Sequence, residues 1–443
     1  MAGLLGTLCS GDWLTLARAR LWALAVLAAS AGGLVYLVAT SDGLIDYQGR
    51  PLGTDFSNVH AAGTYVLEGQ PAAPFDPRLQ HARERAIFGA TTPFYGWHYP
   101  PFFLAVAAAL ALMPYPLALI VWQGVTLALY LLAIKAIVSS CPDIAREDGR
   151  KRPGARASTT FAGSAKPDVD GRDKPGHDAL LYLLALAYPA VFVNLGHGHN
   201  GFLTAALIGF ALVQLDRRPA LAGILFGLLA YKPQFGLMIP LVLVATGRWR
   251  TAFAAAATVV LLILAATLAF GIETWRAFVT FAEYTRTIVL ETGETGWHKI
   301  QSVFAWARMW GAPVSLAYAV QGAVTLVIAA ALMRLWRSPA PFALKAAALC
   351  LAAILATPYS LDYDLMVLAP AIAFLGVDGL ARGFAPWHKT ALALLWIAPL
   401  VARGVAQVTL IPLGVIAMLV MLALVLRRAN GGRTAAPVPA AAQ

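Results

Sequence analysis

Residues 21–40, LWALAVLAASAGGLVYLVAT, form an uninterrupted apolar run that follows Arg18 and Arg20 directly. A helix of that length is about 30 Å long, which matches the hydrocarbon core of a bilayer. Because the run lacks a clear small-residue cleavage site, we interpret it as a first transmembrane helix rather than a signal peptide. Across all 443 residues, 59% are hydrophobic and 12% are charged, whereas soluble domains carry about 25% charged residues. The sequence therefore predicts an integral membrane protein.

Further apolar runs of similar character continue to the end of the chain. They predict an all-α, polytopic transmembrane helical bundle of about twelve spans. The later spans are expected at 117–139, 179–195, 200–215, 219–231, 235–246, 251–271, 313–333, 341–357, 364–380, 388–406 and 409–426. The runs 219–231 and 235–246 are short for a bilayer, and we interpret them as a tilted or broken hairpin.

Basic residues indicate the orientation of the bundle. The pairs fall on alternate ends of the spans, at Arg217/Arg218, Arg248/Arg250, Arg334/Arg337, Arg382/Lys389 and Arg427/Arg428. The positive-inside rule then predicts that both termini lie in the cytoplasm. This clustering also accounts for the net charge of +11, so we expect no nucleic-acid partner. The three cysteines show no metal-binding spacing.

Four segments are expected outside the spans. Residues 41–116 predict a long extracytoplasmic first loop that contains short interfacial helices, with a re-entrant helix from Phe102 to Leu112 that is too short to span. Residues 140–178, rich in Pro, Gly and Asp, predict a disordered cytoplasmic insertion. Residues 272–312 form a second polar loop on the extracytoplasmic side. Residues 427–443 predict a disordered cytoplasmic tail that follows a membrane domain over 1–426.

Asp55 and His60 are the first residues in the long loop that suit chemistry. A carboxylate near the membrane surface can act as a general base for a hydroxyl nucleophile. The alternative is that Asp55 caps the helix that the apolar spacing after it predicts. His60 comes one turn later and is expected on the same helical face.

Polar residues next to short apolar helices provide further candidates for substrate binding. The WHYPP stretch brings His98 and Tyr99 to the re-entrant helix, and the GHGHN turn contributes His197, His199 and Asn200. Two histidines at this spacing suit hydrogen bonds to a phosphate or sugar better than a metal, since no third ligand is evident. For GHGHN the alternative is a plain polar turn, and for the aromatic residues an interfacial belt.

Lys232 and Gln234 belong to the YKPQ stretch that ends the run 221–231. An ionisable residue at membrane depth is costly and indicates a functional site. Lys232 suits a lipid-borne phosphate, and the alternative is that its ammonium extends to the interface.

Two later stretches complete the candidate set. His298 and Lys299 lie in the aromatic loop 272–312 and suit a sugar and a phosphate, while Asp362 and Asp364 in PYSLDYD suit sugar hydroxyls or a cation. One of the two acids is alternatively a helix cap. The chain contains no phosphate-binding glycine loop of the kinds that bind nucleotides.

The order of these motifs resembles glycosyltransferase family 87 over about residues 20–380. The motifs are an early aspartate (Asp55), YPP (99–101), a G-x-x-N-like turn (196–200), AG-x-x-x-G (222–227) with Lys232–Pro233, and Pro-x-Ser (358–360). The resemblance implies the GT-C architecture, a polyprenyl-phosphate sugar as donor, and Asp55 as catalytic base. Tyr363 and Asp364 stand where the mannosyltransferase branch tends to have a histidine, so the donor sugar is mannose or another hexose or pentose.

The mechanism that the resemblance implies is an inverting displacement. Asp55 deprotonates a hydroxyl of an extracytoplasmic lipid or glycan acceptor, and Lys232, His98 and Lys299 stabilise the departing polyprenyl phosphate. No metal or cofactor is expected. The protein is expected in the bacterial cytoplasmic membrane, among membrane lipids, with its active site on the extracytoplasmic face. The alternatives are a transporter or flippase, which predicts inverted repeats that we do not find, and a non-catalytic membrane scaffold.

Overall fold

The computed structural model describes residues 2–150 and 175–431, and these residues fold into helices joined by loops and short turns. Among them, eight helical segments are long and apolar enough to cross a membrane. They are α2 (Leu16–Ala39), α6 (Tyr115–Arg150), α7 (Pro175–Leu186) joined to α8 (Pro189–His197), α12 (Trp249–Phe270), α15 (Val314–Trp336), η7 (Asp362–Val367) joined to α17 (Leu368–Arg382), α18 (His388–Thr409) and α19 (Leu413–Gly431).

Shorter apolar helices fill the space between these long ones. They are α9 (Gly201–Gln214), α10 (Pro219–Leu228), η3 (Leu229–Tyr231), η4 (Pro233–Gly236), α11 (Met238–Ala245) and α16 (Phe342–Leu355). Every residue of α16 from Ala343 to Leu355 except Lys345 is buried. A helix that is apolar on all faces is stable when protein surrounds it. Four of the twelve predicted spans are these shorter helices, so the predicted count of about twelve is not confirmed.

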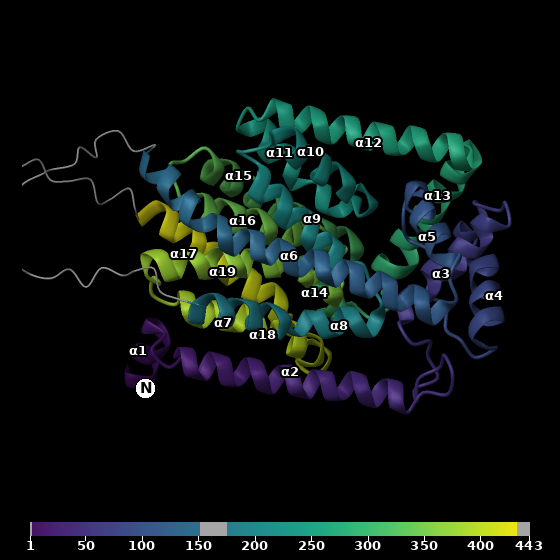
Figure 1. The fold of residues 1–443 in the computed structure, drawn as a ribbon, viewed down its shortest axis with the longest axis horizontal. Helices are drawn as coiled ribbons and strands as arrows, with labels where there is room; N and C mark the ends of the chain where they lie inside the picture. The colour runs from purple at the N-terminus through teal and green to yellow at the C-terminus, as the bar shows by residue number, and fades with distance from the viewer. Residues whose placement is uncertain (1, 151–174, 432–443) are drawn as a thin grey trace, which may run out of the picture.

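A group of helices lies at one end of the long helices. It includes α3 (Thr54–Leu67), η1 (Ala73–Phe75), α4 (Pro77–Phe88), η2 (Pro101–Phe103), α5 (Leu104–Ala111) and α13 (Ile272–Tyr284). The chain continues from α13 into η5 (Thr285–Glu291), η6 (Trp297–Lys299) and α14 (Val303–Met309). Figure 1 shows α3, α4, α5 and α13 together at the right-hand end of the molecule. Helix α1 (Ala2–Ser10) lies at the opposite end, beside the start of α2.

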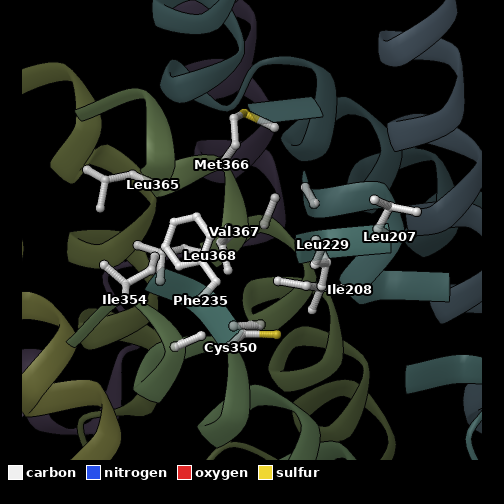
Figure 2. Packing of buried hydrophobic residues seen from close by; sticks show 14 of the residues in the cluster. Leu207, Ile208, Leu229, Phe235, Cys350, Ile354, Leu365, Met366, Val367 and Leu368 are labelled. Atoms are coloured by element: carbon white, nitrogen blue, oxygen red, sulfur yellow. The ribbon is translucent and has the colours of Figure 1, made fainter. Parts of the chain in front are cut away.

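A compact core joins the segments that carry the later polar motifs. Figure 2 shows Phe235 of η4 packed among Ile354 of α16 and Val367 of η7. Phe235 and Val367 are both fully buried. Because interiors are close-packed, this contact holds η4 and η7 in one arrangement. The core thus determines the relative positions of Lys232, which precedes η4, and Asp364, which lies in η7.

Helix α3 is held against α5 by a close approach at Gly63. A Cβ atom at this position would clash with the backbone carbonyl of Ala107. Only glycine permits two helices to approach so closely here. This contact seats α3, and with it Asp55, on the re-entrant helix that the sequence predicts at 102–112.

Helices adjoin both of the segments that the sequence predicts to be disordered. Helix α6 continues to Arg150 and α7 begins at Pro175, so the ends of the 140–178 segment are helical, and residues 151–174 lie outside the described part of the chain. Likewise α19 continues to Gly431, beyond the predicted start of the tail at 427, and residues 432–443 lie outside the described part. In both places a helix extends further than its apolar run.

Candidate active site

Asp55 lies in the first turn of α3, with its side chain 20% exposed. The N-cap residue is Gly53, in a left-handed conformation with φ of 69°, and no side chain caps this helix end. Asp55 is therefore not the helix cap that the sequence left as the alternative. Burial raises the pKa of Asp55, and protonated His197 opposes that rise. A raised pKa makes a carboxylate a more effective general base near neutral pH.

The GHGHN turn lies directly against the beginning of α3. Gly198 adopts φ of 65°, and a Cβ there would lie 2.6 Å from Cβ of Phe56. Buried Asn194 shapes this turn, since its amide donates to the His199 carbonyl at 3.0 Å and accepts from Gly201 N at 2.8 Å. This packing brings His197 to α3, where its Nδ1 lies 2.7 Å from Oγ1 of Thr54 and 3.9 Å from Oδ2 of Asp55.

Tyr363 lies between the two histidines of this turn. Its ring stacks on His199 at a centroid distance of 3.5 Å and meets His197 edge-on at 5.8 Å. His199 also contacts Tyr99, since its Nε2 lies 3.2 Å from the Tyr99 hydroxyl. The GHGHN turn, the YPP motif and the segment after Pro-x-Ser thus form one aromatic cluster beside Asp55.

Lys232 and Asp364 form a buried ion pair. The Lys232 ammonium donates to Oδ1 of Asp364, and both side chains are at most 4% exposed. The backbone N–H of Leu361 donates to the other carboxylate oxygen at 2.9 Å. Asp364 therefore neutralises Lys232 within the protein, and it also accepts the hydrogen bond of the backbone N–H that precedes η7.

A second group of charges gathers around Asp362. Its Oδ2 lies 3.4 Å from Nη1 of Arg403 on α18, and Lys299 and His298 interact electrostatically with both residues. The loop that carries Lys299 is attached to the Pro-x-Ser segment, because Gln301 N donates to the Ser360 carbonyl at 2.6 Å. Lys299 is also within electrostatic reach of Asp55.

Three predicted site residues are not brought into these clusters. Nε2 of His60 lies 3.1 Å from the Met113 carbonyl. Nδ1 of His98 lies 3.0 Å from Oγ1 of Thr285, and burial lowers the pKa of His98 to about 4. A histidine with that pKa is neutral at pH 7 and brings no positive charge to a phosphate. Gln234 is half-buried in η4, next to Lys232.

Asn200 is 2% exposed, and among the described residues its side-chain oxygen has no hydrogen-bond partner. It is the N-cap residue of α9.

Sequence reasoning missed Arg403, Asn194 and Thr54. Arg403 had a recognisable signal, because a lone arginine inside an apolar span is rare and marks a functional position. Asn194 and Thr54 had none, since their roles depend on which backbone groups and rings the fold places beside them.

The chain matches one protein-family model, that of glycosyltransferase family 87, over residues 97–358. The chain belongs to glycosyltransferase family 87. No curated protein and no solved structure matches it. The matched part includes the WHYPP, GHGHN and YKPQ motifs, whereas Asp55, Asp362, Asp364 and Arg403 lie outside it. The protein is thus a membrane glycosyltransferase of this family, and its apolar helices agree with that assignment.

Two further observations concern the surroundings of the site. Among the side chains that the structure describes, in residues 3–140 and 179–430, no group of three or more His, Cys, Asp or Glu is arranged to hold a metal ion. A largely apolar cavity of about 1000 Å³ lies between α2 and the helices α7, α17 and α18. None of the candidate residues lines this cavity, so the site around Asp55 is a separate region.

Proposed function

We propose that this glycosyltransferase transfers a sugar from a polyprenyl-phosphate donor to an extracytoplasmic lipid or glycan acceptor, with inversion, and that Asp55 is its general base. The proposal rests on one observation: Asp55, His197 and the segment after Pro-x-Ser lie close together in the fold. Asp362, Asp364 and Lys232 all influence the ionisation of Asp55. The early aspartate, YPP, the GHGHN turn, Lys232 and the segment after Pro-x-Ser are therefore neighbours in space, whereas AG-x-x-x-G packs on α12.

The environment of Asp55 suits proton abstraction. Its Oδ2 atom is buried and has no hydrogen-bond partner among the described residues, while the side chain as a whole stays partly exposed. An acceptor hydroxyl can therefore donate to this carboxylate. As the hydroxyl oxygen attacks the anomeric carbon, its proton moves to Asp55, and the bond from that carbon to the phosphate oxygen breaks.

The surroundings of Asp55 also suit a sugar. The half-buried Tyr363 offers an aromatic ring and a hydroxyl group, and the Asp362 carboxylate accepts hydrogen bonds from hydroxyls. The sugar is mannose or another hexose or pentose. We infer that the site faces the extracytoplasmic side of the bacterial cytoplasmic membrane, because the basic clusters between the spans predict the cytoplasm at the other end.

A transfer assay tests the proposal. It compares the transfer of labelled sugar by membranes that contain Asp55→Asn with transfer by membranes that contain wild type. A panel of polyprenyl-phosphate sugars is the donor. We expect the rate to fall by about 10²–10⁴-fold, the usual contribution of a general base. Asp42→Asn is the control, because Asp42 is an exposed residue of the same loop. Equal transfer by Asp55→Asn and wild type would remove Asp55 from the mechanism. Substrate uptake without any transfer by wild type would favour the transporter alternative.

A further inference from the structure

Two lysines of the candidate site differ in their charge environment. Lys232, which sequence reasoning assigned to the donor phosphate, is 4% exposed and donates to Asp364. A phosphate at Lys232 would have to displace a carboxylate that is itself buried and would then be left unpaired. Lys299 is half-buried in η6, and Asp362, the acid that affects its ionisation most, also pairs with Arg403.

Around Asp362 positive charge is in excess. The Asp362 carboxylate pairs with the guanidinium of Arg403 and interacts electrostatically with Lys299 and with the half-buried His298. Burial and the charge of Arg403 both lower the pKa of Lys299, and η6, which carries Lys299, packs against α18, which carries Arg403. Such a pair is stabilised when an anion binds between its members.

The geometry of Arg403 suits a ligand rather than a structural ion pair. Its side chain is 39% exposed, whereas that of Asp362 is 10% exposed. Among the described residues, the Arg403 guanidinium contacts Asp362 through Nη1 at 3.4 Å, a long distance for a charge-assisted hydrogen bond. A guanidinium has five N–H donors in a planar fork that matches two oxygens of a phosphate. Arg403 therefore has the capacity to bind a second anion.

We propose that Arg403 and Lys299 form the binding site for a lipid-borne phosphate, and that Lys232 is a positioning residue that holds Asp364 and Tyr363. The inference rests on the proposed function in one respect, because that function identifies this phosphate as part of the polyprenyl-phosphate donor. The same chemistry also fits the phosphodiester headgroup of an anionic bilayer lipid. In the donor, the bound oxygens are those of the leaving group, where negative charge develops.

A binding assay tests the site. It measures the affinity of sugar-free polyprenyl phosphate for the full-length protein in neutral-lipid nanodiscs. We expect Arg403→Gln and Lys299→Gln to weaken binding by about tenfold or more each, and Arg403→Lys to recover part of the loss. Arg276→Gln is the matched control, since Arg276 is an exposed arginine of α13 that pairs with Glu273. A parallel titration with phosphatidylglycerol distinguishes the two sources. Arg403-dependent binding of that lipid alone would assign the phosphate site to a bilayer headgroup.

Asp362→Asn separates an anion site from a structural pair. If Arg403 binds phosphate, removing the competing carboxylate leaves the affinity for polyprenyl phosphate unchanged or raises it. If the pair only holds α18 in place, Asp362→Asn and Arg403→Gln weaken binding alike, and the proposal is overturned. Wild-type affinity in Arg403→Gln, with loss in Lys232→Met/Asp364→Asn, would also overturn it and return the phosphate to Lys232.

The binding assay contains no sugar, so it remains informative if the proposed transfer reaction is wrong. Arg403-dependent binding without any sugar transfer by wild type would support the phosphate site and reject the transferase proposal. Transfer that depends on Asp55 but not on Arg403, with unchanged binding in Arg403→Gln, would reject this inference alone.

Discussion

Oδ2 of Asp55 lies 3.9 Å from Nδ1 of His197, and the same nitrogen lies 2.7 Å from Oγ1 of Thr54. His197 therefore belongs to the surroundings of the proposed base, although the two residues are far apart in the sequence. When protonated, His197 favours the ionised form of Asp55 and opposes the effect of burial.

The pH profile of sugar transfer should reveal this relationship. Because the pKa of Asp55 is raised above 3.8, the rate should increase with pH through a range higher than that of an ordinary aspartate. His197→Gln removes the opposing charge, so its acid limb should move to still higher pH. Rates measured between pH 4.5 and 9 check this expectation, with His81→Gln on α4 as the control. An acid limb that stays in place in His197→Gln would contradict the assigned contact.

Lys232→Met should destabilise the protein strongly. The substitution leaves Asp364 buried without its cation, which costs about 3–5 kcal/mol in comparable pairs. The double variant Lys232→Met/Asp364→Asn should recover much of that loss, because no buried charge remains and the amide oxygen still accepts from Leu361. Thermal unfolding of the purified variants in detergent measures both. Equal unfolding temperatures for the two variants would show that the pair does not determine stability here.

Glu84 should make stability depend on pH. Burial raises its pKa from 4.5 to about 7, so the folded state favours the protonated form. The stability contributed by that proton is complete below pH 4.5 and is lost as the pH rises through about 7. At pH 8 the ionised form costs up to about 3 kcal/mol.

The variant Glu84→Gln should therefore gain unfolding temperature relative to wild type at pH 8 and gain little at pH 5. Exposed Glu273→Gln on α13 is the control, expected to change the free energy of unfolding by less than about 0.5 kcal/mol. A constant difference between Glu84→Gln and wild type across this pH range would contradict the assignment.

Gly63→Ala should disturb both folding and transfer. The added methyl group would meet the Ala107 carbonyl and the Ala111 side chain, and overpacking typically costs about 1–3 kcal/mol. Helix α3 would have to move, and with it Asp55. Gly124→Ala on α6 is the matched control, because open space surrounds that position. Unfolding temperature and transfer rate are the measurements, and equal values for the two alanine variants would show that α3 and α5 have room to separate.

The sequence by itself determined that this chain is a membrane protein, where its apolar helices run, and which family it belongs to. These properties are local, because a run of apolar residues has the same free energy in a bilayer whatever its neighbours are. Eight of the predicted spans correspond to helices long enough to cross a membrane. The four shorter ones, such as α16, are apolar because protein surrounds them, and composition does not distinguish that environment from lipid.

The tertiary structure alone decided which charges are available to a ligand. Lys232 and Lys299 look alike in the sequence, yet Asp364 neutralises the first, while the second shares Asp362 with Arg403. Likewise, His98 is neutral, and its Nδ1 lies within hydrogen-bond distance of Oγ1 of Thr285 in η5. The free energy of a charge depends on partners and burial within a few ångströms, and those partners come from distant parts of the chain. For that reason Asp55 was identifiable as a candidate base and His197 as a candidate binding residue from their motifs. The contact between these two residues, and the pairing of Arg403 with Asp362, depend on the fold.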